Sequence, residues 1–251
     1  MSHRFIDRFC HEDSCVHRLD ARVKTLLVLV FLVVQVSTPP PHLQAFVIYA
    51  GLLLWATALA RIPPGQLLGR AALVLPFSAF VALGLPFLHG GQTVTVLGLQ
   101  LSQNGLWLLF GATIKSLLAA TAVILLMATT PFSRLLGALR HLGAPVFFID
   151  ILAMTQRYLS LLIEEATRLR RAAIARGYVP KWLPQSVIVG RLAGSLFVRS
   201  YERAERVYGA MRLRGYTGLL PSAPLPPLAR SDWWLLLSLA GLFLAVRLVV
   251  R

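Results

Sequence analysis

The chain has 251 residues, of which 57% are hydrophobic and only 14% are charged, and its formal net charge is +15. Soluble domains usually contain about 25% charged residues, so this composition argues against a soluble globular protein. Three long stretches, residues 25–60, 71–114 and 116–133, contain no Asp, Glu, Lys or Arg. A helix needs only about 20 apolar residues to cross a bilayer. The chain is therefore predicted to be an integral membrane protein; a very apolar buried domain is the alternative.

A polar arm, residues 1–24, precedes the first apolar run and contains several carboxylates, so we do not expect it to be a secretory signal. The arm holds both cysteines of the chain, and two thiols do not make a disulfide framework. We place it in the reducing cytoplasm. The arm also contains histidines, which can bind metals as cysteines can. The spacing of these residues does not match a zinc site, so we prefer the interpretation that they have a structural or incidental role. These side chains are His3, Cys10, His11, Cys15 and His17.

Two apolar segments, residues 25–38 and 42–60, are predicted to be the first spans. Three prolines at 39–41 separate them, and no straight helix can run through these prolines. The first segment is short for about 30 Å of hydrocarbon. We expect it to borrow a turn from residues 21–24, with Lys24 snorkelling towards the interface. A partly inserted hairpin is the alternative.

Residues 67–88 form a third apolar segment, which we predict to be a helix kinked at Pro76 and Pro86. Residues 89–103 are uncharged and contain a Thr-Val-Thr-Val alternation, which indicates a short β-hairpin. Residues 104–128 form a fourth apolar segment that is long enough to cross the bilayer.

A fifth apolar segment, within residues 232–251, begins beside two tryptophans that suit an interfacial aromatic belt. Lys and Arg gather in the arm and in residues 131–231, and positive charge favours the cytoplasmic side. We therefore predict a multi-pass protein of the cell inner membrane with about five spans. Its parts are an arm at 1–24, four spans within 25–130, a cytoplasmic domain at 131–231 and the last span. Arg247 and Arg251 then lie on the outer side, against the rule.

The cytoplasmic region is too polar to span and too apolar to be a linker. In residues 150–176, apolar side chains recur at helical spacing opposite a polar stripe, which predicts a long amphipathic helix.

A seven-residue pattern in this region occurs twice, and the second copy follows the first by 38 residues. Its four-residue spacing places the side chains on one helix face, with Glu164–Arg168 and Glu202–Arg206 in the favourable order for ion pairs. Each copy ends in glycine, the usual residue just after a helix. The pattern thus predicts two long amphipathic helices. The copies are Glu164, Ala166, Arg168, Ala172, Arg176, Gly177 and Tyr178, and Glu202, Ala204, Arg206, Ala210, Arg214, Gly215 and Tyr216.

Arg176 and Arg214 fall in the last turn of these helices, where the helix dipole favours a cation. Ala172 and Ala210, one turn earlier, leave room for a partner surface. We interpret the two helix ends as docking elements that insert into two equivalent sites on partner proteins. A stripe that faces solvent or lipid headgroups is the alternative, and the repetition of the pattern favours docking.

Paired Ala-Arg-Gly-type motifs at the ends of long cytoplasmic helices resemble the transmembrane T component of energy-coupling factor (ECF) transporters. The entry to the first span, residues 17–24, is similar to that of the cobalt-transport member, CbiQ. The first motif, Ala175-Arg176-Gly177, matches literally. The second reads Leu213-Arg214-Gly215, so only its Arg-Gly core carries over.

The resemblance implies an all-α integral membrane protein with about five transmembrane helices and a cytoplasmic helical coupling domain. It also implies that the helices ending at Arg176 and Arg214 dock onto two ATP-binding ABC-type ATPase subunits. The chain would then transmit ATP-driven closure to a substrate-binding membrane subunit. Cobalt is the expected substrate, and nickel, biotin or another vitamin are the alternatives.

Neither a nucleotide-binding loop nor a hydrolase motif occurs in the sequence, so we expect a non-catalytic subunit without a cofactor or resident metal. Lys115 is the only charged residue well inside a predicted span. Lys115 has two interpretations. In the structural one, its side chain snorkels or forms a hydrogen bond to a neighbouring helix; in the functional one, it contacts the substrate-binding subunit. The basic residues follow membrane sidedness, so no nucleic acid is expected. A membrane-bound enzyme or a lipid-binding protein is the alternative of another class.

Overall fold

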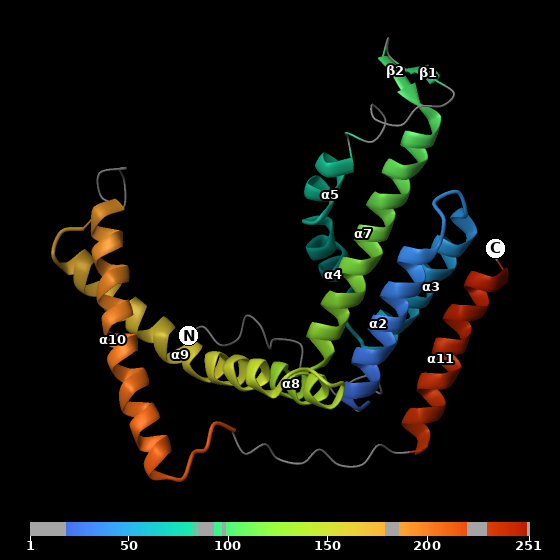
Figure 1. Cartoon of the computed structure of the whole chain (residues 1–251). Coiled ribbons are helices and arrows are strands. Elements are labelled where there is room, and N and C mark those ends of the chain that lie inside the picture. Colours follow the sequence, from blue (N-terminus) through green and yellow to red (C-terminus); the bar gives the residue numbers. More distant parts are fainter. Residues whose placement is uncertain are drawn as a thin grey trace. The chain divides into compact units, whose positions relative to one another are not determined.

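The computed structural model of the chain describes residues 19–82, 84, 93–96, 99–178, 186–219 and 230–249. The chain divides into two compact units, one formed from residues 1–142 and 226–251 and the other from residues 143–225. We call them, after the roles predicted above, the membrane unit and the coupling unit. Almost all of the described residues are helical (Figure 1). The histidines and cysteines of the arm, His3, Cys10, His11, Cys15 and His17, lie outside the described residues.

Helix α2 (Ala21–Ser37) starts one turn before the apolar run, as predicted. The Asp20 carboxylate accepts a hydrogen bond of 2.8 Å from the backbone N–H of Arg22. This cap satisfies one of the N–H groups that have no partner at a helix start. The three prolines follow the end of α2, and α3 (Leu43–Leu59) begins after them, so the predicted break is confirmed.

The predicted third segment is wrong in form, because two helices replace a single kinked one. Helix α4 (Pro64–Ala72) ends before α5 (Leu75–Ala82) begins. Pro76 has no N–H to donate, and its ring clashes with the carbonyl group four residues earlier in a continuous helix. The helix therefore restarts just before this proline. Pro86 lies outside the described residues.

The predicted hairpin is confirmed by two antiparallel strands, β1 (Thr93–Val96) and β2 (Leu99–Ser102). It leads directly into α7 (Gln103–Thr129), whose first turn is capped by the Ser102 hydroxyl. At 1.5 Å per residue, α7 is about 40 Å long. This length exceeds the hydrocarbon thickness of about 30 Å.

Helix α7 is the centre of the membrane unit (Figure 1). It contacts α2, α3, α4 and α5, while α2 also contacts α8 (Phe132–His141) and α11 (Arg230–Val249). Phe243 of α11 packs edge-on against Phe31 of α2, with ring centroids 5.3 Å apart. The main buried cluster joins α2, α3 and α7 through Phe31, Val34, Ala45, Phe46, Tyr49, Leu118 and Ala122.

Lys24 does not snorkel, so this prediction is wrong. Its side chain is buried, and Nζ donates to the backbone oxygen of Thr129 at 3.1 Å and to Oγ1 of Thr130 at 3.4 Å. The ammonium group thus donates its hydrogen bonds to the end of α7.

Lys115 makes a similar contact, in which a lysine of α7 donates to a backbone oxygen of α2. Its Nζ donates to the backbone oxygen of Val36 at 2.8 Å, and Nε2 of the buried Gln35 donates to the backbone oxygen of Lys115 at 3.0 Å. The hydrogen bond to a neighbouring helix, one of the two interpretations of Lys115, is therefore present. Its contact with a substrate-binding subunit stays a prediction.

The coupling unit contains α9 (Val146–Ala175) and α10 (Ser186–Leu213). By length and composition, two helices in the described part of the chain can cross a membrane, namely Asn104–Thr129 within α7 and α9 itself. Shorter apolar helical segments occur at Gln44–Leu59 and at Leu67–Phe80, which runs from α4 into α5. Five spans and the cytoplasmic position of α9 therefore stay predictions.

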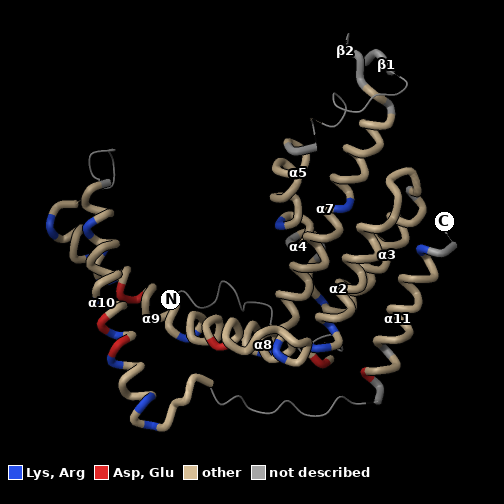
Figure 2. The backbone as a smooth tube through the Cα atoms, in the orientation of Figure 1, with Lys and Arg blue, Asp and Glu red and all other residues tan. Residues whose placement is uncertain are grey.

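Charge is distributed unevenly over the two units. Figure 2 shows few charged residues along α2, α3 and α7 and many along α9 and α10. The membrane unit, where charge is scarce, exposes large apolar side chains such as Phe77 at 74% and Phe80 at 77%. An apolar exterior of this kind is typical of lipid contact.

The substitution Gly111→Ala should destabilise the membrane unit. An added Cβ would lie 2.8 Å from Cβ of Pro40, so the proline turn would have to move away from α7. We expect a loss of about 1–3 kcal/mol in the free energy of unfolding, visible as a lower melting temperature of the detergent-solubilised protein. Gly51→Ala is the matched control, because nothing lies within 4 Å of its added Cβ. Equal melting temperatures for the two variants would contradict the close approach.

Candidate functional site

The first copy of the repeat ends α9 in a left-handed turn. The N–H of Gly177 donates to the oxygen of Ile174 at 3.0 Å, and the N–H of Tyr178 donates to the oxygen of Ala173 at 3.1 Å. Gly177 has a φ of 85°, a conformation that costs an L side chain about 1–2 kcal/mol. These two hydrogen bonds form a Schellman motif, and Arg176 is the last residue before the chain turns away.

The second copy ends α10 in the same way. The N–H of Gly215 donates to the oxygen of Arg212 at 3.0 Å, and the N–H of Tyr216 donates to the oxygen of Met211 at 3.0 Å. Gly215 has a φ of 81°. Each hydrogen bond has its counterpart 38 residues earlier, so the sequence repeat is also a repeat of backbone structure.

Side-chain exposure also follows the repeat. Arg176 and Arg214 are both exposed, and so are Ala172 and Ala210, while the tyrosine after each glycine is half-buried. The predicted residues of each motif therefore gather at one helix end. They are Ala172, Ala175, Arg176 and Gly177 on α9, and Ala210, Arg214 and Gly215 on α10. Lys115, the other predicted contact, belongs to the membrane unit.

Arg176 and Arg214 lie at opposite ends of the pair formed by α9 and α10. Arg176 lines a cavity together with Ile188 and Arg191 from the start of α10. Met211, near the end of α10, lines another cavity together with Phe147 from the start of α9. The two helices are thus antiparallel, and each motif lies beside the beginning of the other helix.

One ion-pair prediction holds and the other is wrong. Glu202 and Arg206 approach to 4.0 Å, as predicted. Arg168 instead pairs with Glu165 at 2.6 Å rather than with Glu164. Glu165 also binds Arg199 of α10, so this carboxylate connects the two helices and draws Arg168 towards it.

The same contacts affect the charge state of Glu165. The hydrogen bond from Arg199 lowers the pKa of the Glu165 carboxyl below its ordinary value, and the positive charge of Arg168 acts in the same direction. Glu165 lies beyond the apolar first half of α9. The carboxylate is therefore ionised at neutral pH and bridges both helices.

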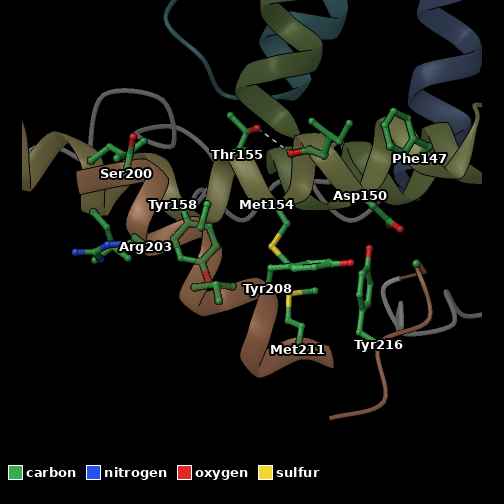
Figure 3. Close-up of a pocket in the computed structure, with 16 residues that line it drawn as sticks. Phe147, Asp150, Met154, Thr155, Tyr158, Ser200, Arg203, Tyr208, Met211 and Tyr216 are labelled. Atoms are coloured by element: carbon green, nitrogen blue, oxygen red, sulfur yellow. Dashed lines mark hydrogen bonds between the residues drawn. The ribbon is translucent and has the colours of Figure 1, made fainter. Parts of the chain in front are cut away.

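The cavity near the second motif is mainly apolar and has a volume of about 410 Å³. Figure 3 shows Tyr208, Met211 and Tyr216 grouped near Met154 on its lower side. The repeat did not predict this cavity, because its lining comes from both helices. Among the described residues, no three His, Cys, Asp or Glu side chains gather where they could hold a metal ion.

The family model of the cobalt transport protein CbiQ matches residues 12–224, which include both motifs and most of the membrane unit. The chain belongs to the CbiQ family. Membership in a transport family implies a membrane location, and the CbiQ-family chain is a membrane component of a transporter.

Individual relatives cover most of this CbiQ-family chain. The energy-coupling factor transporter transmembrane protein EcfT of Bacillus selenitireducens is 29% identical over 230 residues, which are 85% of this chain and 84% of that protein. The nickel permease LarQ of Lactiplantibacillus plantarum is 30% identical over 176 residues, or 66% and 59% of the two chains. The putative fused cobalt transport protein CbiMQ of Methanocorpusculum labreanum is 26% identical over 215 residues, or 82% and 36%.

Replacing either cap glycine should loosen the helix end that it closes. Gly177→Ala and Gly215→Ala force an L side chain into a left-handed conformation, at a cost of about 1–2 kcal/mol each. We expect faster amide hydrogen exchange in the last turn of the affected helix. Gly194→Ala, in the interior of α10 with nothing within 4 Å, should leave exchange unchanged or slow it. Unchanged exchange in both cap variants would contradict the role of the left-handed turns.

Proposed function

We propose that this chain is the transmembrane scaffold of an ATP-driven ECF importer. The helix ends at Arg176 and Arg214 dock onto two ATP-binding ABC-type subunits and transmit their closure to a substrate-binding membrane subunit. The observation that carries the proposal is the structural repeat, since two ends with the same backbone and the same exposed arginine suit two equivalent partners. The likeness to EcfT proteins supports it.

Cobalt is the substrate that we propose, because the family is described as a cobalt transport protein. Nickel is the second candidate, which the similarity to the nickel permease LarQ favours. No cluster of three or more His, Cys, Asp or Glu side chains that could hold a metal ion occurs among the described residues. We propose that the substrate-binding subunit recognises the ion.

We further propose that the chain crosses the inner membrane about five times, with the N-terminal arm and the coupling unit in the cytoplasm. The excess of positive charge in residues 131–231 supports this orientation. The apolar first half of α9 then lies against the membrane or a partner. The polar second half carries the first motif.

Removing the two arginines should weaken the binding of the ATPase subunits. Truncating a central interface arginine typically costs at least about 2 kcal/mol, which is roughly thirtyfold in affinity. We expect Arg176→Ala and Arg214→Ala each to weaken co-purification of the ATPase and metal uptake. The double variant should lose far more, because either tethered end alone retains part of the binding.

Arg171→Ala is the control for this experiment, since Arg171 is exposed on α9 and has no counterpart in the second copy. Lysine at either motif position should restore binding only in part, because it keeps the charge and loses the planar fork. Normal ATPase binding by the double variant would show that the repeat is a solvated surface.

The proposed orientation is open to a labelling test in a chain whose native cysteines are replaced by serine. Thr95→Cys, in the hairpin, should react with an impermeant maleimide in intact cells. Thr217→Cys, just after the second motif, should react only after the cells are opened. Labelling of Thr217→Cys in intact cells would contradict the five-span arrangement.

A further inference from the structure

A hollow of about 420 Å³ opens beside the first motif, between the last turns of α9 and the first half of α10. Three arginines line it: Arg176 from α9, and Arg191 and Arg199 from α10. Neither Asp nor Glu is among the described residues that line this hollow. We call it the basic hollow.

The three positive charges are not equally compensated. Arg199 is neutralised by Glu165, which holds α10 against α9. Arg176 and Arg191 form no ion pair with any carboxylate of the described residues. Two uncompensated arginines around one concave surface repel each other, so an anion that enters between them is stabilised by both.

In the part of the chain that the structure describes, no hollow with several arginines lies beside the second motif. The cavity on its side is mainly apolar, with Arg203 as the one arginine and Asp150 as the one carboxylate among its described lining residues. The helix that bears the second motif supplies a second cation, because Arg212 precedes Arg214 by two residues, whereas the matching position of the first copy is Ile174. The first motif therefore gains its second arginine from the neighbouring helix. A comparison of the two copies along the sequence does not reveal this arginine.

We propose that Arg191 is a docking residue that acts together with Arg176 as a clamp for a carboxylate on the ATP-binding subunit. This inference rests on the proposed docking of the first motif and adds the chemistry of its partner, an acidic surface. Two guanidinium groups on opposite walls can each donate hydrogen bonds to a carboxylate. Charge complementarity with the hollow favours a protein carboxylate that reaches past the exposed end of α9.

The surroundings of Arg191 suit this role. Arg191 is exposed on a long helix, so its guanidinium is accessible and its backbone is held rigidly. The Glu165–Arg199 ion pair fixes α10 beside α9 near the same hollow. Glu165 and Arg199 therefore act as positioning residues, and Arg176 and Arg191 contact the partner.

A double-mutant cycle tests the clamp in the full chain, purified with co-expressed ATP-binding subunits. Arg191→Ala should weaken ATPase binding about tenfold, within the range found for interface arginines. When Arg191→Ala is combined with Arg176→Ala, ATPase binding should weaken little further, because both substitutions remove the same contact. When Arg191→Ala is combined with Arg214→Ala, ATPase binding should be severely reduced, because both helix ends are then impaired. Arg171→Ala serves as the exposed, uninvolved control.

The outcomes separate this inference from the proposed function. Should Arg176→Ala weaken binding while Arg191→Ala does not, the clamp is refuted and the docking of the first motif stands. Should the losses from Arg176→Ala and Arg191→Ala simply multiply, the two arginines do not share a carboxylate and the clamp is also refuted. If neither Arg176→Ala nor Arg214→Ala affects ATPase binding, the proposed function is refuted. The inference about Arg191 is then refuted too, because it depends on that function.

An anionic lipid is the competing occupant of the basic hollow. Vesicles of phosphatidylglycerol and phosphatidylcholine, compared with phosphatidylcholine alone, measure this contact. The clamp predicts that Arg191→Ala leaves the binding of the purified chain to either vesicle unchanged. Reduced binding to the phosphatidylglycerol vesicles, with unchanged ATPase affinity, would overturn the clamp.

The substitution Arg191→Glu should weaken ATPase binding more than Arg191→Ala does, because the new carboxylate repels the partner's carboxylate.

Discussion

The membrane unit depends on the antiparallel pair of α2 and α7, which lysine side chains join near both ends of α2. The last carbonyl groups of a helix have no partner within that helix. Lys24, at the start of α2, donates to Thr129 at the end of α7, and Lys115 of α7 donates to Val36 at the end of α2. Each lysine therefore caps the C-terminal end of its neighbour. In apolar surroundings both the ammonium group and the carbonyl group would otherwise be costly to bury.

The coupling unit is held together differently, and this difference bears on its function. An ion-pair network centred on Glu165 joins its two helices, while apolar side chains such as Phe147, Phe148 and Phe197 are each more than 60% exposed. Large exposed apolar patches are uncommon on soluble monomers and mark sites of contact with proteins or membranes. A pair of helices with this surface is typical of a part that contacts lipid or other proteins. The second motif lies beside part of this apolar surface, because Phe147 lines the same cavity as Met211 and Tyr216.

Features encoded locally were predictable from the sequence. The break at the three prolines, the hairpin and the glycine after each motif all depend on a few adjacent residues. The hydrogen bond of Lys115 to a neighbouring helix was one of the two interpretations that its place in an apolar segment allowed. The restart of the helix before Pro76 was missed because a proline that kinks a helix and one that divides it look alike in a sequence.

Contacts between distant residues were not predictable. Lys24 and Thr129 are more than a hundred positions apart, and nothing near either residue indicates the other. The Glu165–Arg199 pair and the basic hollow likewise need the two helices to be placed side by side. The repeat identified Arg176 because its copy lies at a fixed offset. Arg191 has no such copy, so only the fold connects it to the first motif.

The length of α9 has a mechanical consequence. Thirty residues of uninterrupted helix span about 45 Å, and hydrogen bonds along the axis make such a rod stiff. A tilt of about 10° around its N-terminal end moves the far end by roughly 8 Å, by simple geometry on that length. Because Arg176 is the last residue before the chain turns, it undergoes nearly the whole displacement. A partner that grips this arginine therefore acts on the longest lever arm that the helix provides.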